Sequence, residues 1–424
     1  MRKFNNRLNE KLKLTLICSF LIFISVIHLY SEDIQCEWSG IERIIAVGDV
    51  HGDYENFITI LKRPEIKIID DKLHWIGGKT HFVQIGDVMD RGDRAKDVLE
   101  FLKRLTKEAE AAGGKVHVLL GNHEELNILN RSFEFENYVT VDQFLDFIPD
   151  EYRKKREKKI RRKIGISDSE QTNSDSDLHP EIRVFWENHL KIARQNRDSE
   201  AQKKYYEGFI HRYGEWILGL NVVIKINNII FVHGGISLRN SKKTLKYIND
   251  RTRLELRESM AQNLGKRPPQ TTFRRSEFLY DQNSPLWYRE YATQKEDVFE
   301  DIVIEILNNL QAEHIVTAHT PVAIDDANRM SKFHKRIWII DTSISEAYEE
   351  GALSALIIKD YGKKIVPWWM SRKKKKQSSS VERPKQIQKI HWIIHFGLPP
   401  FPSYCLKSKA IKKDIFIRGE INEN

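Results

Sequence analysis

The stretch IIAVGDVHG, at positions 44–52, decides the class of fold. Its first four residues form a short apolar run typical of a buried strand, and a loop of glycine, aspartate and histidine follows at once. Asp49 and His51 lie two positions apart in an extended segment, so their side chains point the same way. Polar loops directly after buried strands are where open α/β sheets bind ligands. The stretch therefore indicates an α/β protein with a functional site at its strand ends.

The same strand-then-loop pattern recurs along the chain, which supports the α/β class. Strand runs at 44–47, 82–85 and 116–120 alternate with helical patterns at 54–62, 95–107 and 124–130. An apolar helical pattern follows at 205–218. Further strands are expected at 222–226, 229–232, 315–318, 337–340 and 352–358.

Five short motifs carry residues suited to catalysis, and each follows a strand-like run. They are Gly48–Gly52, Gly86–Gly92, Gly121–Glu124, His233–Gly235 and Ala318–Thr320. Each string alone is more typical of a surface turn or a hydrogen-bonded core histidine. Together, in this order and at strand ends, they indicate one site. Carboxylate, imidazole and amide groups are ligands that Mn, Fe and Zn accept, so the set predicts a site for two such ions.

The residue types fit the hydrolysis of a phosphoester, which is anionic and resists attack by a nucleophile. Two cations about 3.5 to 4 Å apart neutralise the phosphoryl charge and generate hydroxide at neutral pH. A histidine held by a carboxylate then protonates the leaving oxygen. In this chain His123 with Asp90 fits that role.

The motif set resembles the phosphoprotein phosphatase branch of the calcineurin-like metallophosphoesterases. Within that branch it is most similar to the Shewanella-like protein phosphatases, over roughly residues 44–358. The resemblance implies a four-layer α/β/β/α sandwich and a hydrolase that acts through a hydroxide bridging two metal ions. The implied substrate is a phosphorylated protein or a small phosphoester. Because the string His319-Thr320-Pro321 also occurs in a neighbouring branch, the alternative enzyme is a nucleotide or diadenosine-polyphosphate hydrolase.

The resemblance also implies roles for individual residues. One metal would be bound by Asp49, His51 and Asp87, and Asp87 would bridge to the other metal. The remaining ligands of the second metal would be Asn122, His233 and His319. The implied catalytic residues are His123, Asp90 and Arg91, and the implied substrate-binding residues are Arg91, Asn122 and Arg289.

Some positions depart from the better-known eukaryotic phosphatases. Val88-Met89 replaces a usual Tyr-Val pair, Leu120 replaces an Arg, and Ile236-Ser237-Leu238 replaces Leu-Ser-Pro. Asp341–Ser345 also replaces a segment that is richer in Gly and Met in Shewanella-like phosphatases. The three differences from the eukaryotic phosphatases favour the bacterial-like branch, so neither the regulatory subunits nor the inhibitor sensitivity of those phosphatases is carried over to this chain.

Basic residues are concentrated outside the motifs. The net charge is +9, but residues 363–424 contain 15 Lys/Arg and 4 Asp/Glu, so the rest of the chain is close to neutral. Specific nucleic-acid binding is therefore not expected. The basic tail, residues 363–424, is interpreted as a solvated extension, and the alternative function is a module that binds membrane or polyanion. A basic and polar insertion at 150–177 predicts a solvated helix followed by a loop.

The N-terminus has the order of an export signal. Five basic residues and one Glu among the first thirteen precede the apolar stretch Leu14–Tyr30. Residues 1–31 are therefore expected to be a cleaved signal peptide or a retained signal anchor. The catalytic domain, at 41–362, would then lie outside the cytoplasm, either exported or anchored to the membrane. Three scattered cysteines are too few for a disulfide framework or a zinc cluster.

Overall fold

The computed structural model describes residues 34–165, 178–196, 199–265, 276, 278–323 and 327–372. The expectations for the N-terminal leader and for most of the basic tail fall outside these residues. Within the described ranges, no helix is both long and apolar enough to cross a membrane.

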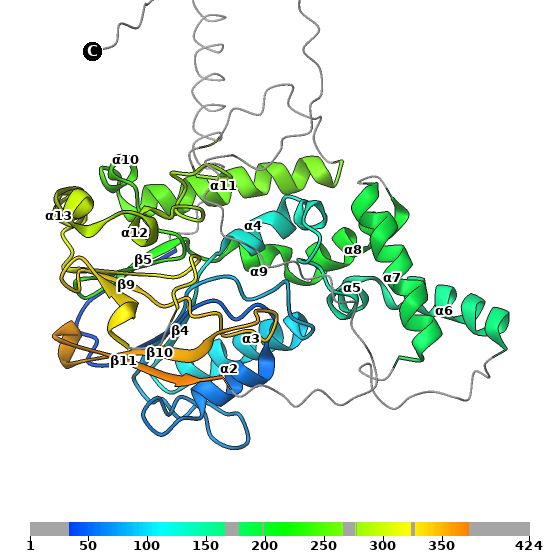
Figure 1. The fold of residues 1–424 in the computed structure, drawn as a ribbon, viewed down its shortest axis with the longest axis horizontal. Coiled ribbons are helices and arrows are strands. Elements are labelled where there is room, and N and C mark those ends of the chain that lie inside the picture. The colour runs from blue at the N-terminus through cyan, green and yellow to red at the C-terminus, as the bar shows by residue number, and fades with distance from the viewer. Residues whose placement is uncertain are drawn as a thin grey trace, which may run out of the picture. The chain divides into compact units, whose positions relative to one another are not determined.

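Two β-sheets form the centre of the fold (Figure 1), and the first three motifs follow strands of the five-stranded sheet. Strand β2 pairs in parallel with β3, and β3 with β4, while β10 runs antiparallel to both β2 and β11. The spatial order is β11 (Lys364–Ser371), β10 (Ala352–Lys359), β2 (Ile44–Val47), β3 (His81–Gln84) and β4 (Lys115–Val118).

The other sheet has six strands and carries the last two motifs. Its strands β6, β7 and β9 are parallel, and β5 is antiparallel to β6. A bridge between Leu119 and Asn221 joins the two sheets. The order is β1 (Glu37–Trp38), β5 (Val223–Ile226), β6 (Ile229–Val232), β7 (His314–Thr317), β9 (Ile337–Ile339) and β8 (Ser331–Lys332).

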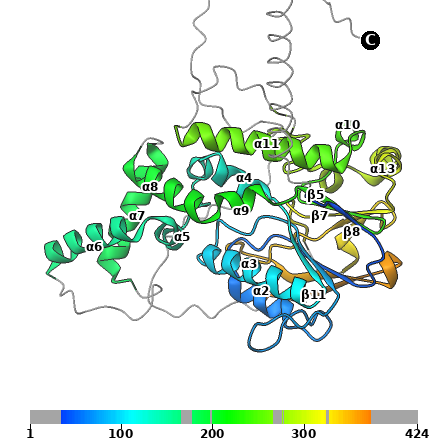
Figure 2. The ribbon, with the colours of Figure 1, turned by 180° about the vertical axis from the view of Figure 1, so that it is seen from behind.

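Helices cover the sheets because the buried strands are apolar on both faces. In β2, Ile45 and Val47 pack in the cluster that includes helices α2 (Tyr54–Leu61) and α3 (Ala95–Ala111). The alternate residues Ile44 and Ala46 pack in a second cluster with the six-stranded sheet. Figure 2 shows α2 and α3 at one side of the sheets and α11 (Leu245–Asn263) and α13 (Glu296–Leu310) at the other. The short helices α10 (Leu238–Ser241) and α12 (Glu290–Thr293) lie near α13 in Figure 1. The predicted mixed α/β class is confirmed.

A helical insertion, helices α5 to α9, separates the two halves of the fold in the sequence. It follows α4 (Asn122–Ile128) and packs through buried aromatic residues, among them Phe144, Trp186, Tyr205 and Phe209. Its helices are α5 (Val141–Phe147), α6 (Asp150–Ile164), α7 (Pro180–Gln195), α8 (Glu200–Phe209) and α9 (Glu215–Leu218), with a π-helical turn at Ile210–Gly214.

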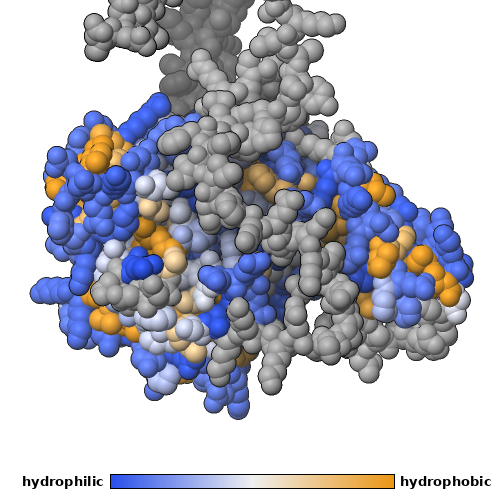
Figure 3. Space-filling view, viewed as in Figure 1, coloured by the Kyte–Doolittle hydropathy of each residue, from blue (hydrophilic) through white to orange (hydrophobic). Residues whose placement is uncertain are grey.

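The surface of the insertion is mixed in character. Helix α6 contains no buried residue, which agrees with the solvated helix expected from its charge. Helix α7 exposes Val184 and Ile192, and Figure 3 shows separate apolar patches over this part of a mainly hydrophilic face.

The C-terminal limit of the catalytic domain lies beyond the expected residue 362. Strand β11 pairs with β10 along its whole length, and Arg372 donates a hydrogen bond to the carbonyl of Ser343 at 3.0 Å. This strand was not predicted from the sequence, because Pro367 lies in its middle and lysines precede its apolar residues. Proline is tolerated here because β11 is an edge strand. At the other end, β1 begins at Glu37, before the expected residue 41.

Candidate metal centre and active site

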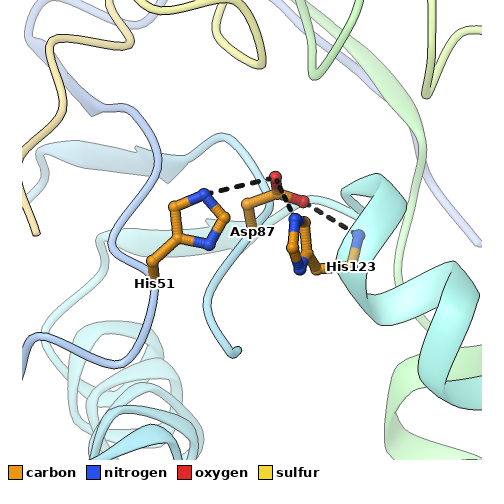
Figure 4. Close-up of side chains that lie close together, drawn as sticks. All are labelled: His51, Asp87 and His123. Atoms are coloured by element: carbon orange, nitrogen blue, oxygen red, sulfur yellow. Dashed lines mark hydrogen bonds and ion pairs between the residues drawn. The ribbon is translucent and has the colours of Figure 1, made fainter. Parts of the chain in front are cut away.

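Asp87 is the central residue of the site (Figure 4). Its Oδ2 atom is 3.7 Å from Nε2 of His51 and 3.7 Å from Nε2 of His123. Its Oδ1 atom accepts a hydrogen bond from the His123 backbone N–H at 3.0 Å and lies 3.3 Å from Nε2 of His233. One buried carboxylate therefore faces three imidazoles, as a ligand shared between two cations would.

Two groups of potential metal ligands share Asp87. In each group the ligand atoms lie within 4.8 Å of one another, and the groups are His51, Asp87 and His123, and Asp87, His233 and His319. Asp49 lies beside the first group, with Oδ2 at 3.8 Å from Nε2 of His51. The side-chain oxygen of Asn122 lies 3.0 Å from Nε2 of His233. The structure thus brings together all six residues expected to bind metal.

Unpartnered polar atoms indicate that this cluster fits cations. Nε2 of His319 and Oδ2 of Asp341 are both buried without a hydrogen-bond partner. A buried polar atom without a partner costs free energy, about 1–3 kcal/mol for a neutral group and more for a charged one. A bound cation would give both atoms a partner, and their nitrogen and oxygen chemistry suits Mn, Fe or Zn.

The electrostatics of the buried cluster also fit bound cations. Burial raises the pKa of Asp49 well above its ordinary value, and the neighbouring carboxylates Asp341 and Asp87 raise it further. Burial lowers the pKa of His51 and His319 well below the ordinary value. Neutral imidazole is the form that binds metal, and cations would relieve the repulsion among the carboxylates.

The backbone around the site adopts conformations that are costly for most residues. His51, Asp87 and His319 have φ angles of 45°, 52° and 65°. Such left-handed conformations cost on the order of 1–3 kcal/mol each and persist where the surroundings enforce them. Gly121 permits the close approach of two loops, because a Cβ atom there would lie 2.2 Å from Oδ1 of Asp87.

Glu124 joins the same two loops. Its carboxylate accepts hydrogen bonds of 2.9 Å from the backbone N–H groups of Asp87, Val88 and Gly121. It lies one position after His123 in the motif, but its role was not predicted. By accepting these hydrogen bonds, the buried carboxylate of Glu124 holds together the two loops that carry Asp87 and Asn122.

The expected pair of His123 and Asp90 is present and buried. Nδ1 of His123 lies 2.9 Å from Oδ2 of Asp90, and the two side chains are 2% and 0% exposed. The opposite ring nitrogen, Nε2, faces Asp87. Asp90 therefore orients the ring so that Nε2 points into the cluster.

Two arginines lie beside the cluster. The Arg91 guanidinium stacks over the Tyr138 ring at 4.6 Å and the Tyr348 ring at 5.4 Å, and its buried Nε has no hydrogen-bond partner. Tyr138 in turn lies 4.2 Å from the His123 ring, between ring centroids. Arg289 is more exposed and donates hydrogen bonds to the carbonyl of His319 at 3.1 Å and to Oγ1 of Thr320 at 3.0 Å.

Asp341 is a site residue that the sequence analysis did not assign. It is 1% exposed and lies close enough to Asp49 for the two carboxylates to perturb each other. It follows strand β9 closely, as Asp49 follows β2 and Asp87 follows β3. This repeated strand-then-aspartate pattern was the available signal.

A shared carboxylate, buried imidazoles and a histidine–carboxylate pair at the ends of strands from both sheets define a phosphoester hydrolase of the two-metal class. The family model of the calcineurin-like phosphoesterases matches residues 42–323, and the chain belongs to this family. The predicted phosphatase class is thereby confirmed.

Several relatives bear the names of phosphatases. The chain is 27% identical over 354 residues to Shewanella-like protein phosphatase 1 of Plasmodium berghei, which covers 81% of this chain and 79% of the relative. A solved structure of a mutant cold-active protein tyrosine phosphatase is 25% identical, with a TM-score of 0.51, covering 81% of this chain and 85% of that one. A symmetrical bis(5'-nucleosyl)-tetraphosphatase of Enterobacter sp. is 36% identical over only 78 residues, 18% of this chain and 22% of the relative. The resemblance inferred from the motifs is confirmed.

Proposed function

We propose that this chain is a metal-dependent phosphatase that removes phosphate from phosphorylated proteins. The observation that carries the proposal is Asp87, shared between two groups of buried ligands and lying beside the His123–Asp90 pair. Two relatives that match along most of the chain, one a curated protein and one a solved structure, bear the names of protein phosphatases, which supports a protein substrate.

The buried cluster would hold two ions of Mn, Fe or Zn, with His123 beside them and not among their ligands. One ion would be held by Asp49, His51 and Asp87, and the other by Asp87, Asn122, His233 and His319. When bound, such ions make water more acidic and offset the negative charge of the phosphoryl group. Carboxylate and imidazole side chains accept all three metals.

The remaining residues would bind the phosphate and move one proton. Arg91 and Arg289 would offer guanidinium N–H groups to the phosphoryl oxygens, together with the amide of Asn122. His123 would donate a proton from Nε2 to the leaving oxygen, while Asp90 accepts a hydrogen bond from Nδ1–H and stabilises the imidazolium. The reaction would release phosphate and the protein hydroxyl.

The roles of Asp87 and His123 can be separated by two variants. We expect Asp87→Asn to lose bound metal and nearly all turnover, because one carboxylate serves both ligand groups. We expect His123→Asn to retain metal and to lose about 10²- to 10⁴-fold in kcat. Metal content is measured by elemental analysis, and turnover with Mn²⁺ by release of phosphate from phenyl phosphate, whose basic leaving group needs a proton.

Exposed residues provide matched controls for this experiment. Asp71→Asn and His334→Asn make the same chemical changes on the surface and should leave metal content and turnover unchanged. Undiminished activity in Asp87→Asn would contradict the proposed centre. Loss of metal from His123→Asn would make His123 a ligand instead of the proton donor.

A substrate panel distinguishes the protein substrate from the alternative nucleotide substrate. The short match to a tetraphosphatase and the string His319-Thr320-Pro321 are what favour the alternative. Phosphopeptides carrying phosphoserine, phosphothreonine or phosphotyrosine are compared with diadenosine tetraphosphate at equal enzyme concentration. Faster turnover of the dinucleotide would favour the alternative.

We also propose, from the sequence alone, that residues 1–31 direct the protein out of the cytoplasm. Five basic residues and the apolar stretch Leu14–Tyr30 support this proposal. The mass of the mature protein shows whether the leader is cleaved, and protection from added protease shows on which side of the membrane the protein lies.

A deletion that tests the basic tail for lipid binding should begin at residue 373, because strand β11 and Arg372 belong to the fold.

A further inference from the structure

Asp90 is enclosed by hydrogen-bond donors from outside the five motifs. Nδ2 of Asn127 lies 3.2 Å from Oδ1 and 3.1 Å from Oδ2 of Asp90. Nε2 of Gln143 donates to Oδ1 at 2.6 Å, and Oε1 of Gln143 accepts the Asp90 backbone N–H at 2.8 Å. Both side chains are buried, so water does not compete for these contacts.

Tyr205 closes these contacts into a ring. Its hydroxyl accepts a hydrogen bond from Nε2 of Gln143 at 2.8 Å and donates one to Oδ1 of Asn127 at 2.9 Å. The path therefore runs from Asp90 through Gln143, Tyr205 and Asn127 and back to Asp90. Because the hydroxyl has one proton, the ring fixes the orientation of both amide groups.

The polarity of the ring requires Asp90 to be an acceptor. The amides of Gln143 and Asn127 both direct N–H groups at its carboxylate, and the remaining acceptor position on Oδ2 faces Nδ1 of His123. The two carboxylate oxygens of Asp90 together accept all these hydrogen bonds, which fixes the plane of the carboxylate group. The ring therefore favours a hydrogen bond from Nδ1–H of His123 to Asp90, so that the second proton of the imidazolium form lies on Nε2, which faces the cluster.

Three helices contribute to the ring, and two of them belong to the helical insertion. Asn127 lies on α4, Gln143 on α5 and Tyr205 on α8. The Tyr205 ring is packed among aromatic side chains, with ring centroids 5.0 Å from Phe133, 5.6 Å from Phe147 and 6.3 Å from Phe209. This packing fixes the position of the Tyr205 hydroxyl. Because the hydroxyl binds Gln143, and Gln143 binds Asp90, the helical insertion sets the position of Asp90.

We propose that Gln143 and Tyr205 are positioning residues for the phosphatase reaction. They hold the side chain of Asp90 in the one orientation that directs Nε2 of His123 at the cluster, where it can donate a proton. The helical insertion is accordingly part of the active site, although neither residue touches substrate. This inference rests on the proposed role of His123 as the proton donor.

The way in which turnover depends on the basicity of the leaving group distinguishes a positioning role from a purely structural one. A proton donor matters most when the leaving oxygen is strongly basic, as in phenyl phosphate, and least for 2,4-dinitrophenyl phosphate, whose leaving group departs without a proton. A general loss of folded protein or of bound metal would reduce the turnover of both substrates by the same factor.

The test compares Tyr205→Phe and Gln143→Met with Tyr206→Phe. Tyr206 lies on the same helix, is equally buried, and donates its hydroxyl hydrogen bond to the carbonyl of Ile128, away from Asp90. For each ring variant, kcat on phenyl phosphate should fall about tenfold, with kcat on the dinitrophenyl ester and KM within about twofold of wild type. Tyr206→Phe should show no such difference between the substrates.

Each outcome decides one question. An equal loss on both esters in Tyr205→Phe, or no loss beyond that of Tyr206→Phe, would overturn the positioning role. If Gln143→Met does not fold, the Tyr205→Phe result alone decides, because that change removes a single oxygen atom. His123→Asn, measured alongside, should show the same selective loss. Equal losses there would overturn the proton-donor role, and with it this inference.

Discussion

At the scale of single residues, the active-site helix α4 buries an ionisable side chain, Glu125, that the proposed catalysis does not use. The side chain is 0% exposed, and its Oε2 atom accepts a hydrogen bond from the Trp287 indole at 2.7 Å. Its Oε1 atom has no partner. Burial raises the pKa of Glu125 to about 8, so the buried carboxyl holds a proton at neutral pH.

This pKa predicts a pH-dependent stability. The folded protein retains the proton on Glu125 up to about pH 8, whereas the unfolded chain releases it near pH 4.5. Between these values the unfolded state binds fewer protons, so this residue lowers the free energy of unfolding as pH rises. Glu125→Gln keeps an acceptor for Trp287 and does not titrate.

We expect the stability of Glu125→Gln relative to wild type to increase between pH 6 and pH 8. The increase should be on the order of 1 kcal/mol per pH unit. Urea denaturation at pH 6, 7 and 8 measures it, with metal concentration held constant. A difference that does not change with pH would show that Glu125 has an ordinary pKa in the folded protein.

At the scale of elements, helices α5 and α8 cross closely. This crossing brings Gln143 and Tyr205 together, and through them it supports the His123–Asp90 pair. Gly208 permits this crossing, because a Cβ atom at that position would lie 1.8 Å from the carbonyl oxygen of Phe147. Thr140 begins α5 by accepting a hydrogen bond from the Gln143 backbone N–H. These local features place Gln143 and Tyr205 within hydrogen-bonding distance.

Gly208→Ala should therefore separate the two helices. Because the contacting atom belongs to the backbone, it cannot move aside as a side-chain end would, and we expect a loss of about 2 kcal/mol or more in the free energy of unfolding. Lys203→Ala, on the exposed side of the same helix, should change stability by less than about 0.5 kcal/mol. Equal stability of the two variants in urea would contradict the close crossing.

At the scale of the whole molecule, the candidate metal centre links the two sheets. Asp49, His51 and Asp87 follow strands of the five-stranded sheet, whereas His233 and His319 follow strands of the six-stranded sheet. Ions held by both groups would connect the halves of the fold and offset the charge of the buried carboxylates. Metal binding and folding should therefore be coupled.

Removal of metal should lower the melting temperature. With free Mn²⁺ at 100 times its dissociation constant, mass action stabilises the folded state by about 2.7 kcal/mol. Differential scanning calorimetry with Mn²⁺ and with a chelator measures the change. Asp87→Asn should respond much less, and an equal response in that variant would place the stabilising ion elsewhere.

Local sequence patterns were sufficient for the α/β class and for the residues of the five motifs. Strand runs such as Ile44–Val47 and Ile229–Val232 have the bounds expected from their apolar residues. Parallel strands present their carboxyl ends at the same edge, so the side chains that follow them could be expected to converge. The carboxylate, imidazole and amide side chains at those positions then indicated a metal-dependent hydrolase.

Only the tertiary structure placed residues whose role depends on distant partners. Asp341 approaches Asp49 across 292 positions of sequence only because β9 and β2 end beside each other, and β11 is recognisable as a strand only by its pairing with β10. The ring around Asp90 joins residues up to 115 positions apart. Hydropathy and spacing report the conformation of neighbouring residues, whereas these contacts depend on how separate helices and sheets pack.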